Sequence, residues 1–189
     1  MKRIHPNYIT SLRAFLFGPI ALVCLMYGFL GWTLTAMALG ELTDFLDGRH
    51  ARRTNQVSNL GKIFDPMCDS IFHMTIWIGF LAVGWISAHY VYFVVLFSAR
   101  DSIVSTIRTY MANHGIVLAA RWSGKIKMCT QSAAQIILVI LHLVPAFKNV
   151  LSCTGLIVVS IAALVTLISL CDYVFHFYQA VKEKRVIIN

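Results

Sequence analysis

Four aspartates between positions 44 and 69 are the residues whose types and spacing could do chemistry. Asp44 and Asp47 are three positions apart, and Asp65 and Asp69 are four positions apart. Residues at these spacings share one face of an α-helix, so two adjacent helices would each present a pair of carboxylates. Carboxylates so close together repel one another unless a cation lies among them, and hard oxygen ligands suit Mg²⁺, Mn²⁺ or Ca²⁺. The pattern predicts a site for divalent metal ions, and we expect two of them.

Glycine and arginine lie among these aspartates. Gly48 and Gly61 remove side-chain bulk where a ligand or a second helix would approach closely. Arg52 has the guanidinium geometry that binds phosphate oxygens. Metal ions, arginine and small residues together suit a diphosphate ligand. Phosphoryl transfer uses these parts, because metal ions neutralise the developing charge and other groups position the nucleophile.

The elements that must position these residues are long apolar segments. The chain has 189 residues, 58% of them hydrophobic, and a mean hydropathy of +0.73. A soluble domain of this size could not bury so much apolar surface, so we expect an integral membrane protein with an all-α fold. The sequence predicts six transmembrane helices, without a linker that would divide residues 1–189 into more than one domain. The expected spans are approximately residues 9–28, 31–53, 64–86, 89–113, 121–144 and 150–180.

The positive charges indicate how these spans are oriented. With six spans, twelve lysines and arginines fall at or near one face of the membrane, and one lysine, Lys148, falls in a loop on the other. The positive-inside rule then puts both termini and the aspartate region on the cytoplasmic side. The net charge of +8 has a sufficient explanation in this topology and in anionic lipid headgroups. Nucleic-acid binding is not expected, because the basic residues lie at helix ends.

The whole pattern resembles a known family signature. It reads Asp44-x2-Asp47-Gly48-x2-Ala51-Arg52-x8-Gly61-x3-Asp65-x3-Asp69. This is similar to the signature of the CDP-alcohol phosphatidyltransferase family, with all eight specified positions present at the family spacing. The resemblance extends to the six-span layout and so covers nearly the whole chain.

The resemblance implies an enzyme that joins a CDP-linked lipid to an alcohol and releases CMP, with two divalent ions, Mg²⁺ or Mn²⁺, on the diphosphate. It implies that Asp44, Asp47 and Asp65 are metal ligands. Asp69 would complete the metal site and act as the catalytic base that takes the acceptor hydroxyl proton. The CDP moiety would be held by Gly48, Ala51, Arg52 and Gly61, and Asn7 and Thr10 are further candidates. The active site would be a polar cavity that opens to the cytoplasm, in a homodimer in the cytoplasmic (inner) membrane of a bacterium.

The acceptor is harder to read. Arg100 and Arg108 lie near one helix face, and Lys125 and Lys127 follow in the next segment, so these four cations could bind a phosphate on the acceptor. The runs GKIK, SARDSIVSTIRTY and PNYITSLR resemble the phosphatidylglycerophosphate synthase branch, which implies CDP-diacylglycerol as donor and glycerol 3-phosphate as acceptor. Ser70 departs from this branch, where we expect a lysine. Inositol phosphate and phosphatidylglycerol stay open as acceptors, and serine is less favoured because it would not require so many cations.

Structural roles compete with these assignments. Arg100 and Arg108 could pair with Asp101 or Glu41 between helices, and Lys125 and Lys127 could serve membrane topology alone. We interpret Asp172 and His176 as a local pair, and His73 as a packing residue. A divalent-cation transporter is the rival from another class, because carboxylates inside spans also mark ion pathways. The position of the aspartates at one cytoplasmic end, beside Arg52, favours phosphate chemistry.

Overall fold

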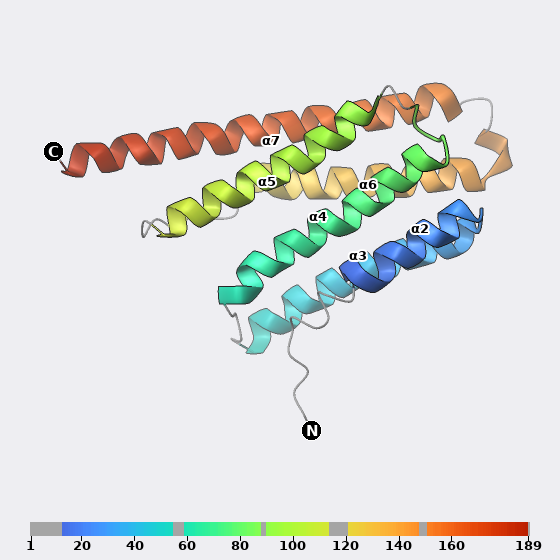
Figure 1. Ribbon diagram of the computed structural model, residues 1–189, viewed down its shortest axis with the longest axis horizontal. Coiled ribbons are helices and arrows are strands. Elements are labelled where there is room, and N and C mark those ends of the chain that lie inside the picture. Colours follow the sequence, from blue (N-terminus) through green and yellow to red (C-terminus); the bar gives the residue numbers. More distant parts are fainter. Residues whose placement is uncertain (1–12, 55–58, 88–89, 114–120, 148–150, 189) are drawn as a thin grey trace.

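The computed structural model describes residues 13–54, 59–87, 90–113, 121–147 and 151–188 (Figure 1). Helix positions 44–54, 59–65, 113, 151–153 and 183–188 are described by their backbone alone. All regular structure in these ranges is helical. The described part of the chain therefore agrees with the all-α fold expected from the sequence.

The first helical segment begins as a π-helix, η1 (Arg13–Phe17), and continues directly as α2 (Gly18–Met26). Pro19 lies in the first turn of α2, directly after the π-helical segment. The helix ends at Met26, and Gly28 follows with a left-handed φ of 77°. The N–H groups of Gly28 and Phe29 donate to the carbonyls of Leu25 (3.1 Å) and Cys24 (2.8 Å), which is a Schellman cap. This tight turn leads directly into α3 (Leu30–Thr54).

The next helix, α4 (Asn59–Ala82), runs through Pro66 and ends in the same way. Gly84 has a φ of 74°, and the N–H of Trp85 donates to the carbonyl of Phe80 at 3.0 Å. Beyond this cap the chain continues into α5 (Val91–Asn113). Two glycines thus reverse the chain at the ends of α2 and α4.

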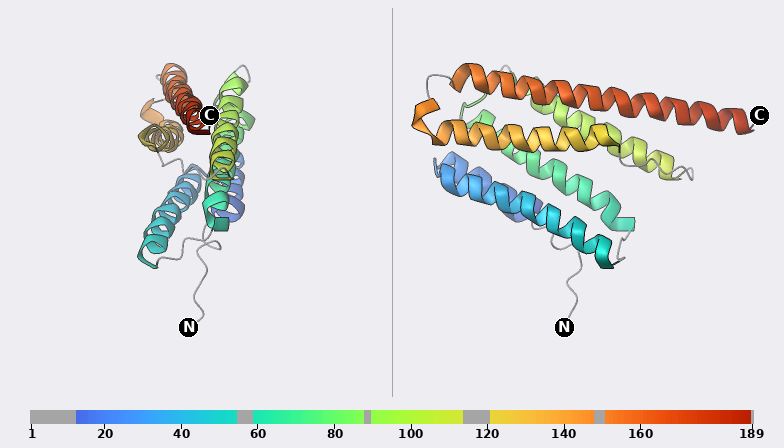
Figure 2. Two further views of the ribbon diagram at one scale, coloured as in Figure 1. Left: turned by 90° about the vertical axis from the view of Figure 1, so that its left-hand side faces the viewer. Right: turned by 180° about the vertical axis from the view of Figure 1, so that it is seen from behind.

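The C-terminal half consists of α6 (Trp122–Leu143), the short 3₁₀ helix η3 (Pro145–Phe147) and α7 (Leu151–Ile188). Val144 is extended, as expected for a residue that precedes proline, and this ends α6. Figures 1 and 2 show α6 lying along α7, and α5 also packs on α7.

The helices form an elongated bundle whose two ends differ. The α2–α3 turn, the end of α4 and η3 lie at one end, and the ends of α3 and α5 and the start of α4 lie toward the other (Figures 1 and 2). The hydrophobic core draws residues from α2 to α7, and its large members Trp77, Phe80 and Phe97 are at most 1% exposed. Trp85 extends it by stacking on Phe80 and on His142. The stacked rings of Phe80, Trp85 and His142 lie near the end of the bundle where α4 ends. The polar residues described below lie closer to the end where α4 begins.

The predicted segments and the observed helices agree closely, with differences at the ends. The helix α4 covers Asn59–Ala82, so it begins and ends earlier than the expected span 64–86. The helix α7 continues to Ile188, beyond the expected end at 180. Positions 9–12 of the first expected span lie outside the described residues. Among those described, two helical segments, Trp122–Leu143 and Thr154–Lys182, are long and apolar enough to cross a membrane, and a shorter apolar helix covers Arg13–Met26. The outer face of α7 exposes many aliphatic side chains, including Ile157, Leu164 and Ile168.

Candidate functional site

The contact between α3 and α4 sets the positions of the four aspartates. A Cβ atom at Gly40 of α3 would lie 2.6 Å from Cζ at the tip of the Phe72 ring on α4, so this ring reaches α3 because Gly40 has no side chain. One residue further along each helix, Nε2 of His73 lies 3.8 Å from Oε1 of Glu41. These two contacts fix which faces of α3 and α4 are turned toward each other.

The four aspartates lie further along the same faces of α3 and α4. Asp44 and Asp47 follow Gly40 by four and seven residues, and Asp69 and Asp65 precede Phe72 by three and seven. Such intervals follow one side of a helix. Since α3 and α4 run in opposite directions through this contact, both series lead toward the same end of the bundle. The backbone thus places the two aspartate pairs on the facing sides of neighbouring helices.

Asp69 is the motif aspartate whose side chain the structure describes. Its carboxylate pairs with the guanidinium of Arg13 on η1, and the two side chains are 17% and 4% exposed. The π-helical segment η1 packs against both α3 and α4. Arg13 therefore brings a buried positive charge from the first segment to the predicted catalytic carboxylate.

For the other predicted residues of the metal and CDP sites, the structure describes either the backbone position alone or nothing. Asp44, Asp47, Gly48, Ala51 and Arg52 lie on the C-terminal half of α3, and Gly61 and Asp65 lie at the start of α4. Their side chains, and Asn7 and Thr10 entirely, lie outside the described residues. Among the side chains that are described, no three metal-binding groups converge. The predicted metal ligands therefore remain predictions, with the backbone placement given above.

A second polar cluster surrounds Asp101 on α5. Nζ of Lys127, on α6, donates to both carboxylate oxygens of Asp101, at 2.8 and 2.9 Å. Nη1 of Arg100 donates to Oδ1 at 3.0 Å, and the hydroxyl of Ser70, on α4, lies 3.1 Å from Oδ2. Lys127 and Arg100 are buried, at 3% and 6% exposed. The pairing of Arg100 with Asp101 matches the structural alternative considered for it, although both residues are on the same helix.

Tyr173 on α7 brings the two predicted arginines together. The guanidinium carbons of Arg100 and Arg108 lie 5.3 and 5.2 Å from the centre of its buried ring. The phenol oxygen accepts a hydrogen bond from Nη2 of Arg108, and Nη2 of Arg100 donates to Ser169 at 2.6 Å. Cation–π contacts of this kind are worth about 0.5–2 kcal/mol each. Two arginines eight residues apart on α5 thus both contact the same tyrosine side chain.

The start of α6 lies next to this group. A Cβ atom at Gly124 would be 3.0 Å from the Tyr173 hydroxyl and 3.5 Å from Nη2 of Arg100, so the GKIK segment lies beside the arginines. Lys125 is exposed, and its Nζ is 5.0 Å from the ring centre of Trp122. The structure therefore separates the two predicted lysines: Lys127 is buried and paired with Asp101, and Lys125 is on the surface.

Asp172 has more partners than the local pair expected. Its carboxylate accepts from Nε of Arg121 at 2.6 Å and from the hydroxyl of Ser123 at 2.5 Å. Nδ1 of His176 lies 2.9 Å from the backbone carbonyl of Asp172, which is the i,i+4 contact that the spacing predicted. His73, expected to be a packing residue, is buried but also bonded, with Nδ1 2.8 Å from Oε1 of Gln135.

Tyr173 and Ser169 were not selected from the sequence as functional candidates. A signal for them exists, because Thr166, Ser169 and Tyr173 are polar residues at helical spacing in an apolar helix, and all three are at most 1% exposed. A polar stripe on a buried helix face indicates partners on neighbouring helices.

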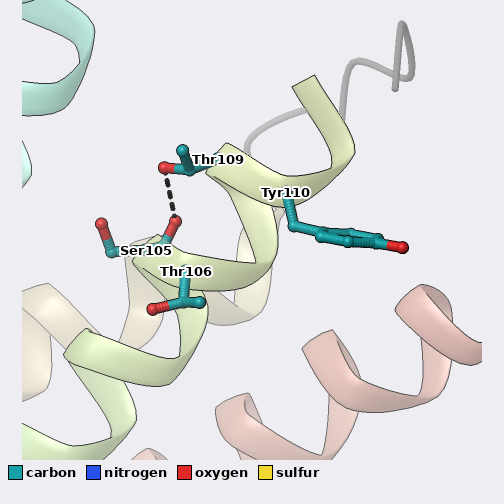
Figure 3. Close-up of a pocket in the computed structure, with 4 residues that line it drawn as sticks. All are labelled: Ser105, Thr106, Thr109 and Tyr110. Carbon is teal, nitrogen blue, oxygen red and sulfur yellow. Dashed lines mark hydrogen bonds between the residues drawn. The ribbon is translucent and has the colours of Figure 1, made fainter. Parts of the chain in front are cut away.

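A surface pocket of about 360 Å³ lies elsewhere on α5, lined by Ser105, Thr106, Thr109 and Tyr110. Figure 3 shows Ser105 and Thr109 on one side of the helix, Thr106 in front of it, and the Tyr110 ring directed away from Ser105 and Thr109. The Thr109 hydroxyl donates to the Ser105 carbonyl at 3.0 Å, within the same helix. None of the lining residues is charged, and we assign no part of the site to this pocket.

Taken together, the described residues offer a carboxylate on α4, Asp69, followed directly by Ser70, which contacts Asp101. The buried cations Arg100 and Lys127 bond to the same Asp101. A carboxylate can take a proton from a hydroxyl group. Arginine and lysine bind phosphate oxygens. The arrangement is suited to deprotonating the hydroxyl of an alcohol that carries a phosphate group.

Comparison with known proteins places this arrangement in a family. The chain is 30% identical to the CDP-diacylglycerol–glycerol-3-phosphate 3-phosphatidyltransferase of Rickettsia typhi over 177 residues, which cover 92% of this chain and 96% of the relative. It is 30% identical to the Bacillus subtilis protein of the same name, over 78% of this chain and 74% of that one. A cardiolipin synthase (CMP-forming) of Streptomyces coelicolor is 31% identical, over 45% of this chain and 38% of its own length.

A solved structure shares the fold. The phosphatidylinositol phosphate synthase of Mycobacterium tuberculosis matches with a TM-score of 0.64, over 93% of this chain and 89% of that one, at 19% sequence identity. At this identity the likeness extends to the fold alone. Residues 3–169 match the family described as CDP-alcohol phosphatidyltransferase. The chain is therefore a member of the CDP-alcohol phosphatidyltransferase family.

Proposed function

We propose that this protein transfers the phosphatidyl group of CDP-diacylglycerol to glycerol 3-phosphate, giving phosphatidylglycerophosphate and CMP in phospholipid biosynthesis. The observation that carries the proposal is the group of cations Arg100, Arg108 and Lys127, which Asp101 and Tyr173 hold together. Asp101 also contacts Ser70, the residue that follows Asp69. This arrangement suits an acceptor that has both a hydroxyl and a phosphate. The relatives from Rickettsia typhi and Bacillus subtilis, which match over most of their length, are named for this reaction.

In the proposed reaction the acceptor hydroxyl oxygen attacks the phosphorus atom that bears the diacylglycerol. A new P–O bond forms, the P–O bond to CMP breaks, and CMP leaves with the electron pair. Asp69 takes the hydroxyl proton as general base. Its carboxylate lies in a largely buried position on α4, held by Arg13. A fixed position of this kind favours proton transfer because little reorganisation is needed.

The donor set fits divalent ions. Four carboxylates on the facing sides of α3 and α4 supply the hard oxygen ligands that Mg²⁺ and Mn²⁺ prefer. We propose that Asp44, Asp47, Asp65 and Asp69 hold two such ions, which would neutralise the diphosphate and the charge that develops on the leaving CMP. Gly48, Ala51, Arg52 and Gly61, with Asn7 and Thr10, are proposed to hold the CDP moiety, by resemblance to the family signature.

Arg100, Arg108, Lys125 and Lys127 are proposed to bind the acceptor phosphate. Arg100 and Arg108 each have a buried Nε without a hydrogen-bond partner, and burying such a donor costs free energy unless a ligand or water accepts from it. This favours an anionic occupant next to Tyr173. The same cations would also bind inositol phosphate or the phosphate of phosphatidylglycerol, so these two compounds are the alternative acceptor substrates.

We further propose six membrane spans with the active site facing the cytoplasm, in the inner membrane of a bacterium, and a homodimeric assembly. The apolar helices α6 and α7 and the exposed aliphatic side chains of α7 support membrane insertion. The basic residues gathered at one end of the expected spans support the orientation.

The test is CMP release by purified protein with CDP-diacylglycerol and Mg²⁺, supplied in parallel with glycerol 3-phosphate, inositol phosphate, serine and phosphatidylglycerol. Release with glycerol 3-phosphate alone is the expected result. Release with another acceptor would keep the reaction class and replace the acceptor. Folded protein that releases no CMP with any of them, but conducts Mg²⁺ or Mn²⁺ into vesicles, would overturn the proposal in favour of transport.

A further inference from the structure

Asp101 is the carboxylate on which three helices converge. It accepts from Lys127 of α6 through both oxygens, from Arg100 of its own helix α5, and lies within hydrogen-bond distance of Ser70 on α4. Its side chain is 16% exposed. A carboxylate so far removed from water is stable only when its lone pairs are satisfied, and here four contacts satisfy them. Its orientation is therefore fixed by partners on three elements.

The contact with Lys127 determines where that ammonium lies. A lysine side chain is flexible, and a buried one without a partner would be costly. Both oxygens of Asp101 hold Nζ at 2.8 and 2.9 Å, and the side chain is 3% exposed. An ammonium group has three protons. At most two are directed at Asp101, so at least one stays available for an acceptor phosphate.

The contact with Ser70 connects Asp101 to the other half of the site. Ser70 follows Asp69 directly, so a force on its side chain acts on the turn of α4 that carries the predicted base. The Ser70 hydroxyl lies 3.1 Å from Asp101 and 3.0 Å from the carbonyl of Pro66 in its own helix. A hydroxyl has one proton and donates to one of these acceptors at a time. The Asp101 contact is the one that links α4 to α5.

We propose that Asp101 is a positioning residue that couples the two halves of the active site. Through Lys127 it places a cation for the acceptor phosphate, and through Ser70 it holds the helix turn of Asp69 at a fixed distance from that cation. The acceptor hydroxyl and its phosphate are separated by a fixed number of bonds, so the base and the cation must keep a matching separation. This inference rests on the proposed function and adds to it a residue that touches neither the base nor the reacting atoms.

The experiment compares three variants with wild-type protein. Asp101→Asn removes the charge, Lys127→Met removes the cation, and Ser70→Ala removes the hydroxyl. Glycerol 3-phosphate binding is measured by calorimetry in EDTA, where no turnover occurs, with inorganic phosphate as a second probe. The kcat and both KM values are measured from CMP release. Thr106→Val, on the exposed side of α5, is the matched control and should behave like wild type.

We expect the effect on acceptor binding and the effect on kcat to appear in different variants. Lys127→Met should weaken glycerol 3-phosphate binding about tenfold or more and leave kcat at saturating acceptor nearly unchanged, because a charged hydrogen bond is lost from the acceptor alone. Ser70→Ala should lower kcat and leave acceptor binding unchanged. Asp101→Asn should do both, with the KM for CDP-diacylglycerol within about twofold of wild type, and Asp101→Glu should restore part of each loss. The double variant Asp101→Asn/Ser70→Ala should have the same kcat as Asp101→Asn, because coupled residues are not additive.

Other results would overturn the inference. Tighter phosphate binding in Asp101→Asn would mean that the carboxylate only opposes the anion. Equal losses for both substrates, together with a lower melting temperature and no rescue by Asp101→Glu, would mean a role in folding alone. If wild-type protein binds phosphate but none of the acceptors supports CMP release, the proposed function is contradicted. The calorimetric binding measurements would still test the role of Asp101. Wild-type protein that binds neither glycerol 3-phosphate nor phosphate would contradict both.

Discussion

The guanidinium of Arg13 contacts the carboxylate of Asp69 and so joins the first helical segment to α4. Arg13 lies on the π-helix η1, and both side chains are largely buried. A π-helical turn is rare and often occurs at functional sites. The pair connects the N-terminal segment directly to the residue proposed as the base.

This pair predicts that Arg13 matters most when metal ions are absent. Arg13→Met should lower the free energy of unfolding by about 3–5 kcal/mol in EDTA, because it leaves a buried carboxylate without its cation. The loss should be smaller in Mg²⁺, since bound ions would then neutralise Asp69. Melting temperatures in detergent, with and without Mg²⁺, check this, and Arg13→Lys should lie between the two. Equal destabilisation in both buffers would mean that Asp69 has no part in a metal site.

Asp69→Asn should abolish turnover and preserve binding of CDP-diacylglycerol. Asparagine keeps the shape of the side chain but cannot take the acceptor proton, and loss of a general base costs roughly 10²–10⁴-fold in rate. CMP release and binding of the CDP-lipid are measured on the same preparation. Loss of lipid binding together with turnover would contradict the role as base and favour a structural one.

Tyr173→Phe should raise the KM for glycerol 3-phosphate by roughly tenfold and leave the KM for CDP-diacylglycerol unchanged. The ring stays between Arg100 and Arg108, but the oxygen that accepts from Arg108 is lost, which costs about 1.5 kcal/mol or more for a charged donor. Tyr178→Phe is the matched control, because Tyr178 is on the same helix and 68% exposed. An unchanged acceptor KM in Tyr173→Phe would remove Arg108 from the acceptor site.

Lys125→Ala should raise the KM for the phosphorylated acceptor more than the KM for CDP-lipid. The effect should be small, roughly two- to fivefold, because Lys125 is exposed and its field is screened by water. Lys182→Ala removes the same charge from the exposed part of α7 and controls for a general loss of positive charge. Equal changes in both KM values for Lys125→Ala would indicate that this lysine serves membrane topology.

Gly40→Ala should destabilise the fold by about 1–3 kcal/mol, as expected for overpacking. The added methyl would lie 2.6 and 2.8 Å from ring atoms of Phe72, which is 1% exposed and cannot move aside freely. The Phe72 ring would be displaced from α3 next to the aspartate pairs, so activity should fall as well. Thermal unfolding and CMP release measure the two effects.

Gly31→Ala is the control on the same helix, since no atom lies within 4 Å of the added methyl. It should be neutral or slightly stabilising, because alanine is the better helix former. Gly40→Ala combined with Phe72→Leu should recover stability. A stable and active Gly40→Ala protein would mean that the position of the Phe72 ring against Gly40 is not required.

The sequence by itself determined the helices and the aspartate motif. Apolar segments of about 20 residues are helical in a membrane, because their backbone groups must be bonded within the segment, and the expected ranges agree with α3, α5 and α6 within two residues at each end. Helical ends were less exact at α4 and α7, where Asn59 and Ile188 extend the helices into polar sequence. The spacing of Asp44, Asp47, Asp65 and Asp69 was also sufficient to identify the family that the comparisons then showed.

Only the tertiary structure decided how the charged side chains pair. Lys125 and Lys127 are indistinguishable as sequence letters, yet one is on the surface and the other is buried against Asp101. Tyr173 lies 65 positions from Arg108 along the chain and still accepts its hydrogen bond. Such contacts depend on the rotation and crossing of packed helices, which are set by the packing of α5 and α6 on α7 and by the shape of the whole core. Local periodicity fixes the face on which a residue lies, and packing alone fixes what that face meets.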